Sequence, residues 1–206
     1  MAKKTFKRPR RYLRSRITRK LILDTAWDVF LNEGYSKTTI AKISQQARVG
    51  YGTVYSHFKG KDDILSKVVD NVLDEFYNLL EVPFDPENIE EARNTYYNLV
   101  LTSFRLAEQH RTIMKVYQEA LGQSDTIAAH WHSVIEQFIK NSSRSFAYSQ
   151  EKGFAKNFDI DLGAKAYILL VDRFLWEVVN ETETDLEHIT DTIIEMLFNG
   201  FFHSES

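Results

Sequence analysis

The chain has 206 residues, of which 43% are apolar and 13% aromatic, so it can bury a substantial core and is too apolar to be disordered as a whole. It contains no cysteine, which excludes disulfide frameworks, thiolate metal sites and cysteine nucleophiles. No apolar stretch approaches the roughly 20 residues of a membrane helix, and the basic N-terminus lacks the apolar block of a secretory signal. We therefore expect a cytoplasmic protein that does not enter membranes.

Charge is distributed very unevenly along the chain. The net charge is −3, yet residues 1–61 hold 15 Lys or Arg against three acidic residues, and residues 62–206 hold 11 against 26. The first part therefore carries +12 and the second −15. This asymmetry indicates a segment that contacts a polyanion, joined to a body that does not.

The spacing of apolar residues predicts an all-α protein. They recur at intervals of three and four along nearly the whole chain, and almost no stretch alternates as a strand would. The predicted helices cover about residues 17–33, 39–47, 53–58, 62–80, 86–104, 112–121, 125–150, 161–180 and 184–202.

Several residues predict where these helices begin and end. The first helix has an apolar face that starts at Ile17 and Leu21, and Gly34 is suited to the positive φ that closes a helix. Two prolines between Val82 and Pro86 make the clearest boundary in the chain. Asp85 with Pro86 is expected to open the following helix, and Thr184 with Glu187 is expected to form a capping box for the last one.

Two of the short predicted helices lie inside the basic region and are joined by a glycine-containing turn. This is the pattern of a helix-turn-helix, in which the second helix enters the major groove of DNA and the first braces it across the phosphates. A bare helical hairpin also occurs in many all-α proteins that do not bind DNA, so the pattern alone leaves both interpretations open.

The motif that decides between them is Val49-Gly50-Tyr51-Gly52-Thr53-Val54-Tyr55-Ser56-His57-Phe58-Lys59-Gly60-Lys61, preceded by Glu33-Gly34-Tyr35 and Thr38-Thr39-Ile40. Over about residues 16–75 the chain resembles the N-terminal domain of the TetR family of transcriptional repressors. The resemblance implies a ligand-responsive DNA-binding regulator, most simply a repressor that a small-molecule inducer releases from a palindromic operator. It also implies four segments, namely a basic arm over 1–15, a helix-turn-helix DNA-binding domain over 16–61, a connecting helix over 62–81 and a helical ligand-binding and dimerisation domain over 82–206.

The resemblance assigns DNA contacts residue by residue. Thr39 opens the bracing helix and meets a phosphate, whereas Tyr51 and Thr53 approach base edges at the start of the recognition helix. Tyr55 and His57 reach the sugar-phosphate backbone, and Phe58 belongs to the core. The full predicted DNA-binding set is Thr39, Lys42, Arg48, Gly50, Tyr51, Gly52, Thr53, Tyr55, His57 and Lys61, the last as a phosphate ligand.

Two positions depart from the family pattern. Arg48 stands in the turn where glycine is usual, and a non-glycine residue at positive φ costs about 1–2 kcal/mol. Lys42 stands where an acidic residue is usual, and a cation near a helix N-terminus opposes the helix dipole by about 0.3–1 kcal/mol. Both changes add positive charge to the hairpin, which supports contact with DNA.

The basic arm has two interpretations. Its cations follow the phosphates or enter a minor groove, or else the arm is a solvated tail. The residues concerned are Lys7, Arg8, Arg10, Arg11 and Arg14.

The acidic body is expected to sense a ligand and to dimerise. The family resemblance implies that the last two helices pack against their counterparts in a second subunit, although the same stripes equally suit ordinary core. The predicted dimer residues are Tyr167, Val171, Leu175, Ile189, Ile193, Leu197 and Phe201. An aromatic-lined cavity for an apolar or aromatic inducer is expected from Tyr96, Phe104, Arg105, Tyr117, Gln118, Trp131, Phe138, Arg173 and Phe174.

Other functions find little support in the residues. His130 and His132 are two positions apart, so their imidazoles point in nearly opposite directions from a helix and do not share a metal ion. No catalytic constellation or phosphate loop is present, so we expect no enzyme, no cofactor and no metal. The remaining alternatives are an architectural DNA-binding protein without an inducer and, less well supported, an enzyme that uses the acidic body.

Overall fold

The computed structural model of the protein describes residues 10–202, and the side chains from residue 12 onward. Within this range the protein is all-α, as predicted, and the only β-type pairing is an isolated bridge between Ala155 and Phe202. The helices are α1 (Arg10–Lys37), α2 (Ile40–Gln46), α3 (Tyr51–His57), α4 (Lys61–Leu79), α5 (Ile89–Gln109), α6 (Arg111–Leu121), α7 (Asp125–Glu151), α8 (Ile160–Asn180) and α9 (Leu186–Phe201).

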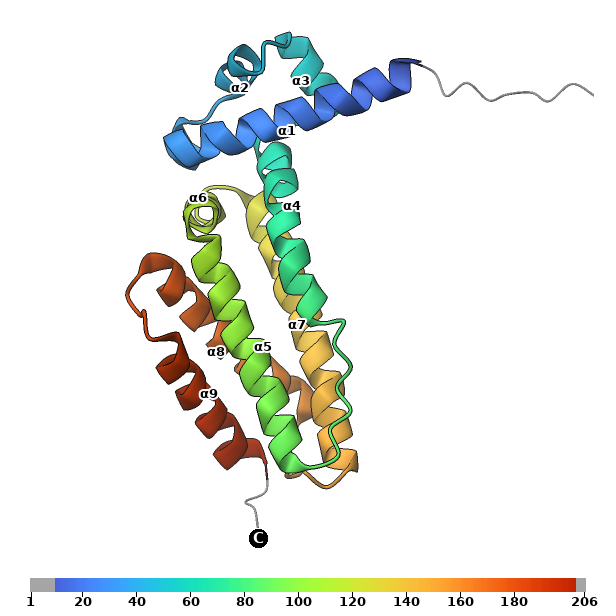
Figure 1. Ribbon diagram of the computed structural model, residues 1–206, viewed down its shortest axis with the longest axis vertical. Coiled ribbons are helices and arrows are strands. Elements are labelled where there is room, and N and C mark those ends of the chain that lie inside the picture. Colours follow the sequence, from blue (N-terminus) through green and yellow to red (C-terminus); the bar gives the residue numbers. More distant parts are fainter. Residues whose placement is uncertain (1–9, 203–206) are drawn as a thin grey trace, which may run out of the picture.

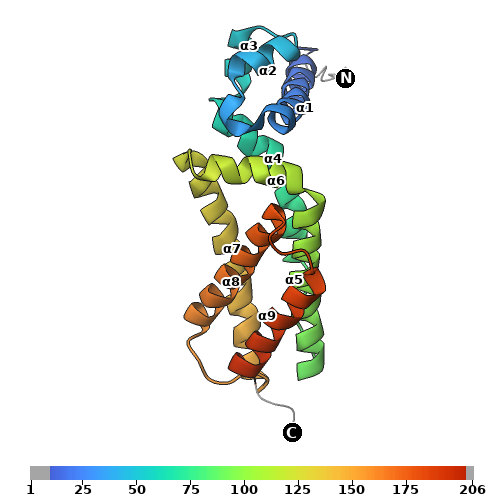
Figure 2. The ribbon, with the colours of Figure 1, turned by 90° about the vertical axis from the view of Figure 1, so that its left-hand side faces the viewer.

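The helices form a small head on an elongated body. Helices α1, α2 and α3 make the head, and α4 runs from it down into the body, where it packs against α5 and α7 (Figure 1). Helices α5 to α9 make the body, and α6 lies across its upper end, directly beneath α1 (Figure 2). The chain leaves the last helix at the end of the body that is farthest from the head.

Helix α1 is longer than the sequence suggested. It begins at Arg10 and not near Ile17, because arginine is a good helix former and the basic residues continue the helical conformation. The predicted apolar face is also wrong at its start. Ile17 is 60% exposed and Leu21 44% exposed, and the face that is buried starts at Ile22. Gly34 takes positive φ (73°), as expected, and breaks the helical conformation there.

Two predicted helix starts are corrected by the caps that the structure uses. Asn88, and not Asp85, caps α5, because its side chain accepts the Glu91 backbone N–H at 2.9 Å. Asp185, and not Thr184, caps α9 by accepting the His188 N–H at 2.9 Å. In both places several candidate capping residues are adjacent, and the side chain that reaches the free N–H group decides the start.

One hydrophobic core connects the head and the body. Helix α4 buries Ile64, Leu65, Val68, Val69, Val72, Leu73 and Phe76, as its periodicity predicts. Because α4 contacts α1 at one end and α5, α6 and α7 lower down, these side chains belong to a cluster that is continuous from the head into the body. A displacement of α4 in the body is therefore transmitted to the head through packed side chains.

Candidate nucleic-acid interface and body cavity

The exposed face of α3 carries two tyrosines that have no packing role. Val54 is fully buried and Phe58 is 3% exposed, which confirms the prediction that Phe58 is core, and together they anchor the helix to the head. Tyr51 and Tyr55 are 54% and 48% exposed, with their hydroxyl oxygens 3.4 Å apart. This hydrogen bond is the main cause that raises the pKa of Tyr55.

The N-terminus of α3 offers open backbone beside these tyrosines. Gly50 is its N-cap residue and has no side chain to cover the free N–H groups. A Cβ added at Gly52 would meet no atom within 4 Å, so the surface beside Thr53 is bare. Helix ends with free N–H groups bind anions, and bare backbone permits close approach of a partner.

Helix α2 supports α3 and begins at an exposed threonine. The Thr39 hydroxyl accepts the Lys42 backbone N–H at 3.2 Å, which makes Thr39 the N-cap as expected. The Lys42 ammonium lies 2.8 Å from a Glu33 carboxylate oxygen, and this pairing lowers the pKa of Glu33. Lys42, which stands where an acidic residue is usual, is thus neutralised within the head by Glu33.

The turn between α2 and α3 has the geometry that glycine normally provides. Arg48 has φ of 53°, its N–H donates to Gln45 O, and the Val49 N–H donates to Ser44 O. This is the Schellman arrangement that closes a helix. Arg48 is exposed in the turn that leads into α3, so its guanidinium is open to solvent.

Lys61 has an intramolecular partner. Its ammonium donates to Tyr35 O at 2.9 Å and lies 3.7 Å from the centre of the Tyr35 ring. Lys61 thus holds the C-terminal end of α1, and because an ammonium has three donors, its role as a phosphate ligand stays a prediction. Of the basic arm, Lys7 and Arg8 lie outside the described residues, whereas Arg14 is exposed on the first turns of α1.

A polar joint fastens the head to α6. The Glu119 carboxylate on α6 accepts the backbone N–H groups of Tyr35 and Ser36 at 2.8 and 3.2 Å, and it also accepts the Ser36 hydroxyl. On the other side, the Tyr35 hydroxyl donates to Asp62 Oδ1 at 2.6 Å, and Ser124 donates to Asp62 Oδ2 at 2.6 Å. We call these five residues the Glu119 joint.

The local environment changes the acidity of both ends of this joint. Burial, with the hydrogen bond to Asp62 as the next cause, raises the pKa of Tyr35 to about 12. The hydrogen bond from Ser36 is the main cause that lowers the pKa of Glu119. Both residues therefore hold a single charge state at neutral pH.

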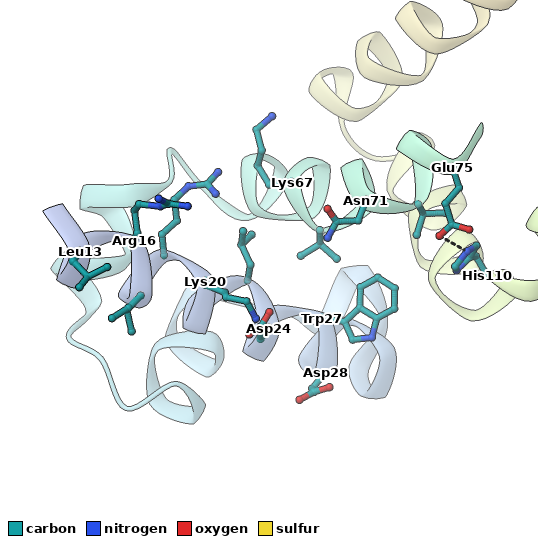
Figure 3. Close-up of a pocket in the computed structure, with 15 residues that line it drawn as sticks. Leu13, Arg16, Lys20, Asp24, Trp27, Asp28, Lys67, Asn71, Glu75 and His110 are labelled. Carbon is teal, nitrogen blue, oxygen red and sulfur yellow. Dashed lines mark hydrogen bonds and ion pairs between the residues drawn. The ribbon is translucent and has the colours of Figure 1, made fainter. Parts of the chain in front are cut away.

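An open groove lies between α1 and α4. It has a volume of about 960 Å³ and is lined on α1 by Leu13, Arg16 and Trp27 among others, and on α4 by Lys67 and Asn71 (Figure 3). At its inner end His110 Nε2 lies 3.0 Å from Glu75 Oε1, which links α4 to the turn between α5 and α6.

The body holds a small cavity between α4, α5, α7 and α8. Its volume is about 40 Å³, which is room for a water molecule or two and not for a drug-sized ligand. Phe76 of α4 lines it, so the connecting helix forms part of its wall. Trp131 and Phe138, both in the predicted ligand set, line it as well, with Ile135, Val171 and Leu175.

The other predicted ligand residues do not reach this cavity. Arg105 and Arg173 are exposed and pair with Glu187 and Glu177. The remaining residues lie in packed core or on its edge, and they are Tyr96, Phe104, Tyr117, Gln118 and Phe174. Aromatic residues at helical spacing do not distinguish a cavity wall from solid packing, so the ligand role of these residues stays a prediction.

Sequence reasoning missed the one ionisable residue of the cavity wall, Asp172. The Trp131 indole N–H donates to its Oδ1 at 3.2 Å. Burial raises the pKa of Asp172, and the indole donors Trp131 and Trp176 oppose that shift. The signal available in the sequence was an aspartate among the apolar positions Ile168, Val171 and Leu175 of one helical stripe.

The predicted dimer residues are largely inside the subunit. Tyr167, Leu175, Ile189, Ile193 and Leu197 are all at most 5% exposed in the isolated chain, so its own core uses them. Val171 and Phe201 are half-buried. The exposed apolar side chains of α8 and α9 are different ones, and they are Leu162 at 66%, Leu169 at 47% and Met196 at 59%.

The two neighbouring histidines of α7 point apart, as the helical spacing predicts. His130 is half-buried, with Nδ1 2.9 Å from the Tyr117 hydroxyl and Nε2 3.6 Å from Asp70 Oδ1. The side chain of His132 is 75% exposed. Within residues 10–202 no group of three or more histidine or carboxylate side chains converges on a possible metal position. In the same range, no helix has the length and apolar character needed to cross a membrane.

Comparisons with known proteins agree with this geometry. The family model described as "Bacterial regulatory proteins, tetR family" matches residues 22–68, which contain α2, α3 and the start of α4. The fatty acid metabolism regulator protein of Bacillus subtilis is 25% identical over 186 residues, covering 87% of this chain and 93% of the relative.

Solved structures share the fold of the whole chain. The repressor of the multidrug efflux pump SmeDEF of Stenotrophomonas maltophilia, SmeT, superimposes with a TM-score of 0.70 at 19% identity, covering 90% of this chain and 91% of its own. A SmeT–triclosan complex gives 0.71 at 21% identity, over 91% and 93% of the two chains. The fatty acid degradation regulator FadR of Bacillus halodurans gives 0.66 at 21% identity, over 89% and 95%.

Proposed function

The chain belongs to the TetR family of bacterial regulatory proteins, and we propose that it represses transcription as a two-fold dimer that a small molecule releases from a palindromic operator. The observation that carries the proposal is the exposed face of α3, where Tyr51, Thr53 and Tyr55 surround open backbone on a rigidly anchored helix.

The head supplies two kinds of DNA contact. Tyr51 and Thr53, at the start of α3, read base edges in the major groove, since only the first turn of a recognition helix reaches them. Thr39, Arg48 and His57 position the head on the sugar-phosphate backbone and carry no sequence information themselves.

Binding to a palindrome needs two heads in fixed relation. One α3 reads only a few base pairs, and half-sites one helical turn apart, about 34–36 Å, call for a two-fold dimer. We assign the dimer contact to the exposed apolar face of α8 and α9, with Leu162, Leu169 and Met196 at its surface. These side chains are free to pack against a partner because the subunit's own core does not use them.

Release from DNA follows from the position of the body cavity. A ligand that enters it separates α7 and α8 from Phe76 on α4, and α4 is continuous with the head. A ligand that binds more tightly to this wider state shifts the population toward a head spacing that no longer matches the operator.

The test measures sequence preference. A palindromic duplex is first selected from random DNA with the full chain, and affinities for it and for a random duplex are then measured by fluorescence anisotropy at fixed salt. Thr53→Ala is expected to weaken binding to the selected duplex by about 1–3 kcal/mol and to leave random DNA nearly unchanged. Thr126→Ala, which removes an exposed threonine of α7, serves as the matched control.

Two outcomes would contradict the proposal. Equal affinity of the unmodified protein for both duplexes favours an architectural DNA-binding protein instead. An equal loss on both duplexes for Thr53→Ala shows that the threonine positions the head and does not read bases.

A further inference from the structure

We infer that the body cavity selects ligands with an apolar body and a cationic head group, with Asp172 as the counter-charge. This inference rests on the proposed ligand-sensing function and adds the charge of the ligand to it. Three observations on the cavity carry it, namely the composition of its wall, the surroundings of Asp172 and the aromatic groups beside that carboxylate.

The wall contains an acid and no base. Apart from Asp172 and Ser103, every lining side chain is aliphatic or aromatic. The arginines that the sequence suggested for ligand binding, Arg105 and Arg173, are at the surface and pair with glutamates there. A ligand carboxylate or phosphate in this cavity therefore meets no cationic partner and one carboxylate.

Asp172 itself lacks a cationic partner among the described side chains. Its recorded hydrogen bond comes from the Trp131 indole, at 3.2 Å to Oδ1. A carboxylate offers about four acceptor positions, so indole donors leave part of its capacity unused. Buried carboxylates are stable when paired, and a cation that arrives with the ligand completes the pair that the subunit does not provide.

The aromatic groups next to the carboxylate suit a cation for a second reason. The rings of Trp131 and Trp176 lie 5.1 Å apart, inclined at 59°. Tryptophan faces attract ammonium groups, and the attraction increases when the cation is desolvated. An ammonium that pairs with Asp172 and lies against the face of either ring is thus held by charge and by the ring together, whereas a carboxylate meets the repulsion of Asp172.

The cavity has to widen before such a ligand fits, and its wall allows this. Ile135, Phe138 and Val171 line the cavity and are half-buried, so part of its wall borders solvent. Phe138 stacks on Tyr77 of α4 with ring centres 6.4 Å apart. Opening the wall at Phe138 therefore disturbs the same helix that carries the head.

The experiment compares three probes with one naphthalene body and different head groups. These are 1-naphthylmethylamine, 1-naphthylmethanol and 1-naphthylacetate, titrated by calorimetry into the full-length protein at neutral pH. We expect the amine to bind at least about 10-fold more tightly than the alcohol, because a charge-assisted hydrogen bond is about twice as strong as a neutral one. The acetate is expected to show no binding at the same concentrations.

Variants assign the preference to one residue. Asp172→Asn keeps the shape of the side chain and removes its charge, and it is expected to abolish the advantage of the amine over the alcohol. Asp161→Asn on the same helix removes an exposed carboxylate outside the cavity and is expected to leave all three affinities unchanged.

The inference is overturned if the acetate binds as tightly as the amine, if the preference for the amine survives Asp172→Asn, or if none of the probes binds. Operator binding by the same preparations is measured in parallel. If the unmodified protein binds its operator but shows no preference for the amine, or if the preference survives Asp172→Asn, the inference on Asp172 is refuted and the proposed repressor stays in place. If the unmodified protein does not bind an operator, the proposed function itself is refuted.

Discussion

Replacing Glu119 by alanine tests whether the head and the body act as one unit. The change removes the acceptor for the Tyr35 and Ser36 backbone N–H groups and for the Ser36 hydroxyl. Hydrogen bonds to charged groups contribute about 1.5–3 kcal/mol when desolvated, but Glu119 is exposed and water replaces part of each bond. We therefore expect the free energy of unfolding to fall by about 1–2 kcal/mol in total.

The functional effect of Glu119→Ala is expected to exceed its effect on stability. Without the carboxylate, what remains between the end of α1 and α6 is their packing and the contact between Ser36 and Gln123, so a ligand that displaces the body moves the head less. Operator affinity measured with and without inducer should therefore differ by a smaller factor than in the unmodified protein, while urea unfolding reports the loss of stability. Glu136→Ala, an exposed glutamate on α7, is the control.

The pH dependence of the same variant adds an independent check. The pKa of Glu119 is lowered by its hydrogen bonds, so its contribution is complete at pH values above the ordinary glutamate value of 4.5 and is lost as the pH falls through the lower folded-state pKa. The stability difference between the two proteins should thus be constant near neutrality and shrink under acid conditions. Unchanged stability at pH 7, or unchanged release by inducer, would refute the role given to this joint.

Three further substitutions have outcomes that follow from single features. Arg48→Gly relieves about 1–2 kcal/mol of left-handed backbone strain, and the larger unfolded-state entropy of glycine offsets about 0.4–1 kcal/mol of that gain. The free energy of unfolding, measured with urea, should therefore rise by about 1 kcal/mol or less. The loss of the cation should weaken DNA binding and make its affinity less dependent on salt concentration. Tyr96→Phe removes a buried hydroxyl that has no hydrogen-bond partner in the described structure, and the melting temperature should hold or rise. His130 has a pKa lowered by burial, so the unfolded chain binds more protons below about pH 6.5, and stability should fall as the pH is lowered through that range; His130→Gln should flatten this slope.

The parts of the fold that repeat along the sequence could be predicted from it. The buried stripe of α4 is uninterrupted, and its period alone identifies seven core residues. The turn at Arg48 is different, because nothing in its composition signals positive φ, and only the resemblance to a family that uses glycine there pointed to it. Helix starts failed where neighbouring residues compete for the cap, as Asp85 and Asn88 do.

Long-range pairings explain most of what the sequence left open. Glu119 is 84 residues from Tyr35, so their hydrogen bond has no local signature. The stripes of α8 and α9 also do not reveal whether their apolar residues face the subunit core or a partner. Tyr167 and Ile193 face the core, whereas Leu169 and Met196 are exposed on neighbouring positions of the same helices. Whether an apolar residue of a helix is buried depends on which other helix packs against it, and that packing is determined by the whole chain.

The Glu119 joint limits how freely this protein can exchange parts with its relatives. A chimera that places its head on another body keeps the core of α4, but it also needs a carboxylate at the matching position of the new α6. Without that acceptor, the Tyr35 and Ser36 N–H groups at the end of α1 lose their partner. A chimera that combines the DNA specificity of one protein with the ligand specificity of another should therefore keep α6 together with the head. A junction at Pro83 and Pro86 separates α6 from the head and breaks this contact.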